Sequence, residues 1–222
     1  MIQSGGLFIT GTDTGIGKTQ ASCALINAFQ SRGLRAVGMK PVASGCELID
    51  GEWRNEDALA LIAASASKAD YALINPYALP MATAPQLATL AAGVSIELPS
   101  LVQAYQQLAA TVDRVVVEGV GGWLAPLSRD LDQSDLVQAL NVPVVLVVGM
   151  RLGCINHARL SERSILFSGH RLLGWLANYP EAGFDADGDY RNALGQSMQT
   201  PLLGNMAFDG KLLLTHAAEC LF

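Results

Sequence analysis

The amino-acid sequence predicts an α/β fold, built on a doubly wound and mainly parallel sheet with helices on both faces. Segments of strand and helix character alternate along the chain and are joined by short connections. Two of the strand segments, residues 114–118 and 142–148, are almost entirely apolar, which is typical of strands that are covered on both faces. The length of 222 residues fits one domain, so we expect a single domain over residues 1–222.

The individual elements follow from apolar spacing and from turn residues. Residues 7–10 have the character of a strand. Residues 20–31 carry apolar side chains at helical spacing, and Gly33 is a typical residue for ending a helix. The other expected elements, in chain order, are a strand over 35–39, a helix over 56–66, a turn-rich segment over 75–85, a helix over 99–111, the strands 114–118 and 142–148, a helix over 155–167, a strand over 171–177, a helix over 190–198 and a weak last strand over 202–206.

Composition narrows the classes of partner. Fourteen basic residues against twenty acidic ones give a net charge of -6 and a pI near 5.0, which disfavours binding to nucleic acid or to an anionic membrane and favours small molecules. The four cysteines and three histidines lack the spacing of a zinc site, so the cysteines are expected to be reduced thiols. No basic leader and no apolar stretch near ~20 residues are seen, so we expect a cytoplasmic protein.

The segment over residues 11–19, G-T-D-T-G-I-G-K-T, follows the first strand directly and has the chemistry of a phosphate-binding loop. Glycines allow a tight turn that aims backbone N–H groups at phosphate oxygens, Lys18 can reach the terminal phosphates, and the Thr19 hydroxyl can bind Mg²⁺. The segment departs from G-x-x-x-x-G-K-[ST], because Thr12 stands where the first glycine belongs and Gly11 lies one residue earlier. A longer variant of the loop, and therefore a nucleoside triphosphate, is predicted; the alternative is a glycine-rich turn with an incidental lysine.

Two charged residues end other predicted strands and would face the same edge of the sheet. Glu118 ends an apolar strand, where its carboxylate could help Thr19 to hold Mg²⁺, and the glycine-rich residues 119–122 that follow allow close backbone approach to a ligand. Lys40 follows the second strand and could be a second lysine near the phosphates. The alternatives are a solvated glutamate at a turn and a solvated lysine, and for Lys40 the spacing alone does not decide.

Five segments taken together resemble the dethiobiotin synthetase family: residues 11–19, 40–45, 54–59, 118–123 and 152–158. The resemblance spans most of the chain and is thinner after Asn178. It implies a single-domain P-loop NTPase-like fold and a homodimer that acts in biotin synthesis as a carbon–nitrogen cyclo-ligase. The implied reaction converts 7,8-diaminononanoate, CO₂ and ATP into dethiobiotin, ADP and phosphate, through a carbamate and a mixed carbamic-phosphoric anhydride.

The resemblance also implies roles for individual residues. The implied catalytic residues are Lys40, Lys18 and Thr14. Those implied for Mg²⁺ are Thr19, Asp57 and Glu118. Those implied for ATP are Gly15, Ile16, Gly17, Lys18, Thr19, Gln20, Asp57, Glu118, Gly119, Val120, Gly121, Asn178, Tyr179, Met206, Ala207 and Phe208. Those implied for the organic substrate are Ser44 and, in a cradle for its carboxylate contributed by the neighbouring subunit, Gly153, Cys154, Ile155 and Asn156.

Several of these residues have a plainer interpretation. Cys154 is favoured as a small packed side chain and His157 as a residue of the first turn of a helix. Asn178 resembles the family's base-contacting asparagine, but Tyr179 replaces its usual acidic neighbour, so the sequence does not decide which base is selected. A buried-strand or surface-turn role for residues 178–179 and 206–208 is equally open. Trp53 and Trp123 are expected to be packing or loop anchors.

Three other functions are possible for a phosphate-binding domain, and the sequence disfavours each of them. A partitioning-type regulatory ATPase would carry a signature lysine five residues before Lys18, where this chain has Asp13. A non-catalytic nucleotide-binding protein is disfavoured because the candidate catalytic and metal-binding residues are retained. A GTP switch is disfavoured because the sequence holds no N-K-x-D string.

Overall fold

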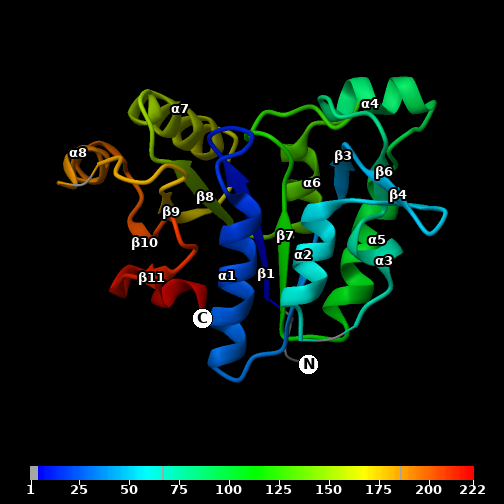
Figure 1. Ribbon diagram of the computed structural model, residues 1–222, viewed down its shortest axis with the longest axis horizontal. Coiled ribbons are helices and arrows are strands. Elements are labelled where there is room, and N and C mark those ends of the chain that lie inside the picture. The colour runs from blue at the N-terminus through cyan, green and yellow to red at the C-terminus, as the bar shows by residue number, and fades with distance from the viewer. Residues whose placement is uncertain (1–4, 67, 186) are drawn as a thin grey trace.

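The computed structural model describes residues 5–66, 68–185 and 187–222. Its centre is a seven-stranded sheet in the order β11-β10-β9-β8-β1-β7-β2 (Figure 1). The pairs among six of the strands are parallel, and β11 alone is antiparallel to its neighbour β10. The strands of the sheet are β1 (Gly5–Gly11), β2 (Ala36–Met39), β7 (Arg114–Glu118), β8 (Val144–Gly149), β9 (Leu172–Asn178), β10 (Leu202–Met206) and β11 (Leu212–Leu214).

Helices cover both faces of the sheet, which confirms the predicted doubly wound α/β fold (Figure 1). The helices are α1 (Lys18–Ser31), α2 (Glu56–Ala64), α3 (Tyr71–Ile74), α4 (Pro85–Ala92), α5 (Leu98–Ala109), α6 (Gln133–Leu140), α7 (Cys154–Phe167), α8 (Asp189–Ser197) and the short 3-10 helix η1 (His216–Leu221). Among the described residues, none of the helices has both the length and the apolar character required to cross a bilayer.

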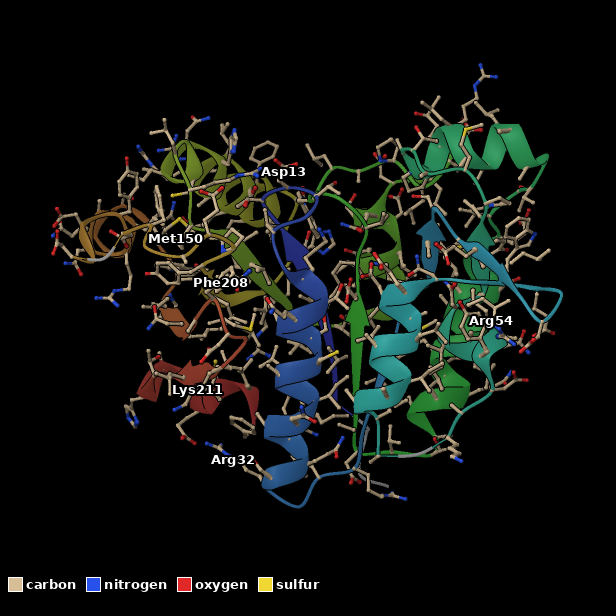
Figure 2. All side chains as sticks on the ribbon, in the orientation of Figure 1. Asp13, Arg32, Arg54, Met150, Phe208 and Lys211 are labelled. Atoms are coloured by element: carbon tan, nitrogen blue, oxygen red, sulfur yellow. The ribbon has the colours of Figure 1, made fainter. Side chains whose placement is uncertain are left out.

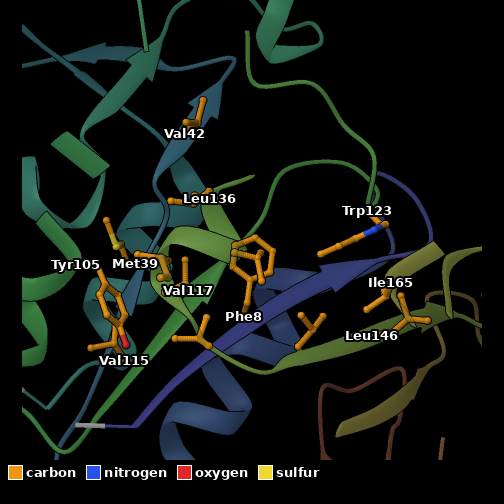
Figure 3. Packing of buried hydrophobic residues seen from close by; sticks show 14 of the residues in the cluster. Phe8, Met39, Val42, Tyr105, Val115, Val117, Trp123, Leu136, Leu146 and Ile165 are labelled. Carbon is orange, nitrogen blue, oxygen red and sulfur yellow. The ribbon is translucent and has the colours of Figure 1, made fainter. Parts of the chain in front are cut away.

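The alternation of side chains along β1 divides the core into two parts. Phe8 belongs to the part that packs against α5, α6 and α7, whereas Ile9 belongs to the part that packs against α1. Figure 3 shows Phe8 in the first part among Val117, Leu136 and Leu146. Both faces of β1 are therefore buried, which explains its apolar run. Both of its edges pair with neighbouring strands, so the loop after β1 starts from a fixed position.

Two small sheets lie beside the main one. The strands β3 (Val42–Ser44) and β6 (Tyr77–Leu79) pair in parallel, and β4 (Glu47–Ile49) and β5 (Glu52–Arg54) form an antiparallel hairpin. In Figure 1, β3 and β6 stand under α4, away from the strands of the main sheet. Of these strands, β3 follows Lys40 most closely, and its residues Ala43 and Ser44 lie on the wall of the candidate site.

Most predicted elements are confirmed, with shifted ends that have local causes. The first helix begins at Lys18, two residues earlier than predicted, because Gly17 adopts a left-handed conformation and caps it. The helix over 56–66 ends at Ala64, since the Ser65 hydroxyl donates to the carbonyl of Leu61 and accepts from the N–H of Gly38. The turn-rich segment predicted over 75–85 also contains the three-residue strand β6. The other elements that the sequence does not predict are α3, α4, α6, β3, β4, β5, β11 and η1.

Candidate active site

The loop between β1 and α1 lies at the carboxyl edge of the sheet and requires its glycines. Gly15 and Gly17 have φ angles of 70° and 86°, in the left-handed region. A Cβ atom on Gly17 would lie 2.1 Å from the side-chain nitrogen of Asn178, so any other residue would clash there. The loop therefore turns the chain directly into α1, whose free N–H groups and dipole favour an anion.

Lys18 is folded into this loop. Its ammonium donates a hydrogen bond to the carbonyl oxygen of Asp13 at 2.8 Å. Burial of the side chain, together with the nearby charge of Lys40, lowers the pKa of Lys18 to about 8. The Asp13 carboxylate accepts from the N–H of Thr14 and forms an ion pair with Arg151, which lies between β8 and α7. Figure 2 shows Asp13 at the tip of the loop.

Four side chains from four elements meet beside the loop. Lys40 Nζ lies 2.8 Å from Asp57 Oδ2 and 2.6 Å from Glu118 Oε1. Thr19 Oγ1 lies 2.7 Å from Asp57 Oδ1 and 2.9 Å from Glu118 Oε1. Lys40 follows β2, Glu118 ends β7, Asp57 is in the first turn of α2 and Thr19 is in the first turn of α1. The sheet order, which places β7 next to β2, brings these distant residues together.

The charges of this cluster compensate one another. Burial opposes the charged form of Lys40, but the carboxylates of Glu118 and Asp57 outweigh it and raise the pKa of Lys40. Burial also opposes the charge of Asp57, but the ammonium of Lys40 outweighs it and lowers the pKa of Asp57. The side chains of Lys40 and Glu118 are only 4% and 0% exposed. The solvated alternatives for Lys40 and Glu118 are therefore wrong.

Polar residues outside the predicted set support the cluster. The side-chain amide of Asn75 donates to the carbonyl of Lys40 at 2.7 Å, and Asn55 caps α2 by accepting from the N–H groups of Asp57 and Ala58. The capping position of Asn55 before an apolar helix was readable from the sequence. The role of Asn75 was not, because the contact joins positions 35 residues apart.

These groups line one cavity of about 400 Å³. It collects residues predicted for catalysis, for ATP and for the organic substrate in a single space. The predicted residues on its wall are Thr14, Gly15, Gly17, Lys18, Thr19, Lys40, Ser44, Asp57, Glu118, Val120 and Gly121. Ala43, Gly45, Asn55 and Glu56 complete the lining.

The other residues predicted for ATP are distributed differently. Tyr179, Ala207 and Phe208 line a separate hollow of about 260 Å³ between the ends of β9 and β10. Asn178 is buried, and its amide donates to the carbonyl of Ile16 at 2.6 Å, so it joins β9 to the phosphate loop. The side chains of Ile16 and Met206 lie in the core, Gly119 is buried and Gln20 is exposed.

The predicted carboxylate cradle lies at the start of α7 and lines neither of these two cavities. Gly153 caps the helix with a φ of 94°, and Cys154 is buried in the core, where burial raises the pKa of its thiol. Ile155 is partly buried, whereas Asn156 and His157 are exposed. The plain interpretations of Cys154 and His157 are confirmed.

The two tryptophans that are predicted to be packing or loop anchors differ in burial. Trp123 is buried in the core and packs edge-on against His170, with ring centroids 5.0 Å apart. Trp53 lies on β5 and is 43% exposed. Trp123 is thus a packing residue that holds the end of the glycine-rich loop after Glu118.

Known proteins resemble this chain in sequence and in fold. Residues 5–212 match the AAA domain family. The ATP-dependent dethiobiotin synthetase BioD of Xanthomonas campestris pv. campestris (strain 8004) is 57% identical over 199 residues, which are 90% of this chain and 89% of the relative. The protein of the same name from Xylella fastidiosa (strain 9a5c) is 61% identical over 171 residues, 77% of this chain and 76% of the relative.

Solved structures share the fold at low sequence identity. The MinC:MinD cell division complex of Aquifex aeolicus matches with a TM-score of 0.56 and 12% identity, over 93% of this chain and 86% of that one. Chloroplast FtsY from Physcomitrella patens matches with a TM-score of 0.56 and 17% identity, over 98% and 66%. These similarities support the P-loop NTPase-like fold alone. The sequence relatives go further, and by their identity and coverage this chain belongs to the dethiobiotin synthetase family.

Proposed function

We propose that this protein is an ATP-dependent dethiobiotin synthetase, a cyclo-ligase that joins CO₂ to the two amines of 7,8-diaminononanoate and releases ADP and phosphate. One observation carries the proposal beyond the names of the relatives. The phosphate loop, Lys18 and the cluster of Lys40, Asp57 and Glu118 line the same cavity as Ser44, so a nucleotide and an organic substrate would meet there.

The first steps bring two anions together, a carbamate and the γ-phosphate of ATP, and the lysines of this chain can reduce their repulsion. One amine of the substrate adds to CO₂ and loses a proton to become a carbamate. A carbamate oxygen then attacks the γ-phosphorus of ATP, and ADP leaves. Lys18 and Lys40 would reduce the repulsion between the two anions and stabilise the charge that spreads over the phosphoryl group. A buried ammonium is effective here because little water screens it.

The last step closes the ring. The second amine attacks the carbonyl carbon of the carbamic-phosphoric anhydride, phosphate is expelled and the amine loses a proton. Because both amines belong to one substrate molecule, proximity replaces a bimolecular encounter. The cavity wall formed by Thr14, Ser44 and Val120 would hold the substrate and limit the access of water, which would hydrolyse the anhydride.

A magnesium ion fits the oxygen donors of the cluster. Among the described residues no group of three or more His, Cys, Asp or Glu side chains could hold a metal by itself. However, Mg²⁺ commonly binds one or two carboxylates together with phosphates and water, and Thr19, Asp57 and Glu118 offer one hydroxyl and two carboxylates. Glu118 Oε2 is buried without a hydrogen-bond partner, as expected of a free ligand position. When bound, the ion would neutralise charge on the β- and γ-phosphates.

The remaining parts of the proposal concern assembly. The start of α7 is the N-terminus of a 14-residue helix and lies outside the lining of the cavity, which supports a role toward the substrate of a neighbouring subunit in a homodimer. The acidic composition supports small molecules as the partners, and the enzyme is proposed to be cytoplasmic. Tyr179, Ala207 and Phe208 are proposed to lie near the base of ATP.

The test is phosphate release from the purified protein with ATP, bicarbonate and 7,8-diaminononanoate. We expect one dethiobiotin, identified by mass spectrometry, for each phosphate released, and no reaction when the diamine is omitted. Equally fast ATP turnover without the diamine would reject the ligase. Lys40→Ala should abolish ring closure and leave ATP binding largely intact, because Lys18 and the loop remain.

A further inference from the structure

Gln133 is a buried polar residue that the reaction scheme does not use. It is the first residue of α6, it is 1% exposed, and its side-chain amide is engaged at both ends. Its Oε1 accepts from the N–H of Val120 at 2.7 Å. Its Nε2 lies 3.1 Å from the carbonyl of Gly122 and 3.4 Å from the hydroxyl of Thr10. The amide thus connects β1 with the glycine-rich loop that forms part of the cavity wall.

The peptide between Gly119 and Val120 is held on both sides. Its N–H donates to Gln133, and its carbonyl, on Gly119, accepts from the ammonium of Lys40 at 3.3 Å. A peptide unit is planar, so fixing the direction of the N–H also fixes that of the carbonyl. The side chain of Gln133 can approach this peptide closely only because residue 119 is a glycine: a Cβ atom there would lie 2.4 Å from Gln133 Oε1.

The start of α6 has support that does not involve the side chain of Gln133. The N–H of Asp132 donates to the carboxylate of Asp135 at 2.8 Å, which secures the first turn. Leu136, one turn further on, is buried in the core. The amide of Gln133 is therefore directed at the loop and at β1 while other residues secure the helix.

We infer that Gln133 is a positioning residue for the reaction: through the Gly119–Val120 peptide it orients the ammonium of Lys40 in the cavity. The inference rests on the proposed function, since it assigns to Lys40 the role of stabilising the transferred phosphoryl group. Lys40 is held by two carboxylates that would also serve Mg²⁺, and the Gly119 carbonyl is the neutral contact that would keep its direction when those carboxylates bind another cation.

The test compares two substitutions at this position with a control on the same helix. Gln133→Met keeps the length of the side chain and removes both polar groups, whereas Gln133→Glu keeps an oxygen for the N–H of Val120. Val137→Ala is the control, because Val137 is a buried residue of α6 that does not line the small cavity shared by Gly119, Val120 and Gln133. We expect Gln133→Met to lower kcat about tenfold, the effect of one lost hydrogen bond at the upper end of its range, with the KM for ATP changed less than about twofold. Gln133→Glu should recover only part of kcat, because it keeps the acceptor for Val120 but turns its second oxygen toward the carbonyl of Gly122. Val137→Ala should lower the melting temperature with kcat retained.

A second measurement needs no turnover. Acetylation of the folded, nucleotide-free protein by acetic anhydride, followed residue by residue by mass spectrometry, should be faster at Lys40 in Gln133→Met and unchanged at Lys18. If the native protein makes no dethiobiotin, the proposed function fails, while the labelling still tests whether Gln133 holds Lys40. An unchanged kcat and unchanged labelling in folded Gln133→Met would overturn the inference. So would an equal loss of kcat in Val137→Ala, which would make the effect one of helix packing.

Discussion

Replacing Lys40 by methionine should destabilise the fold as well as stop the reaction. The side chain of Lys40 is 4% exposed and that of Glu118 is 0% exposed, so Lys40→Met would leave a fully buried carboxylate without its cation. Removing one partner of a buried ion pair costs about 3–5 kcal/mol. Asp57 is 32% exposed and water can solvate it, so the lower end of that range is expected, about 3 kcal/mol.

The assay is thermal unfolding followed by circular dichroism at neutral pH. For a domain of this size 1 kcal/mol corresponds to about 2–4 °C, so Lys40→Met should melt roughly 10 °C below the native protein. Lys211→Met is the matched control, because Lys211 is exposed (Figure 2) and should change stability by less than about 0.5 kcal/mol. Equal melting temperatures for Lys40→Met and the native protein would refute the view that this ammonium compensates the buried carboxylates.

The difference in stability between the native protein and Lys40→Met should change with pH in a defined direction. The folded-state pKa of Asp57 is lowered, mainly by Lys40 against the effect of burial, so its contribution to stability is present above the ordinary value of 3.8 and is lost as the pH falls below it. The folded-state pKa of Lys40 is raised, so its contribution persists until the pH exceeds 10.5. The gap in melting temperature between the native protein and Lys40→Met should therefore be wide at neutral pH and narrow in acid. A gap that stayed constant down to pH 3 would contradict this account.

Three further outcomes are expected. Gly17→Ala should weaken ATP binding by about tenfold or more in calorimetric titration, because its Cβ would meet Asn178, whereas Gly33→Ala, with a φ of 81° and open space, should cost about 1 kcal/mol of stability and leave ATP binding unchanged. Since the pKa of Lys18 is about 8 and the phosphates of ATP would raise it, binding between pH 8 and 9 should take up a proton; heats that do not depend on the ionisation enthalpy of the buffer would argue against this. Glu162→Ala should lower the free energy of urea unfolding by about 2–3 kcal/mol, because the buried carboxylate accepts from two backbone N–H groups and a hydroxyl of the turn after α8; an unchanged midpoint would show that water replaces it.

The long apolar elements could be predicted from the sequence because their signal is local. The strands predicted over 114–118 and 202–206 coincide with β7 and β10. The strand predicted over 142–148 begins two residues late, at Val144, since Pro143 has no N–H for the ladder. The three-residue strands β3 to β6 were missed because so short a run has no periodicity to detect, and β3 and β6 in addition pair with each other across more than thirty residues of chain.

The sequence predicted which residues belong to the candidate site, but only part of the contacts among them. Lys18, Lys40, Asp57 and Glu118 were expected near a nucleotide, and the structure places all four on one cavity wall. The support from Gln133 was not expected. A buried glutamine at a helix start looks like any polar capping residue until the loop that it holds is seen.

The sequence by itself determined that this chain is an α/β protein with a phosphate loop, because glycine conformations, apolar runs and the Gly-Lys-Thr string are local properties. The resemblance carried by five separated segments added the reaction. Only the tertiary structure decided that Lys40 is a buried cation between Asp57 and Glu118, that Asn178 ties β9 to the loop, and that Gln133 holds the peptide facing Lys40. The physical reason is that charge compensation and hydrogen bonding depend on distance in space, and the order of strands in the sheet sets that distance for residues that are 78 or 162 positions apart in the chain.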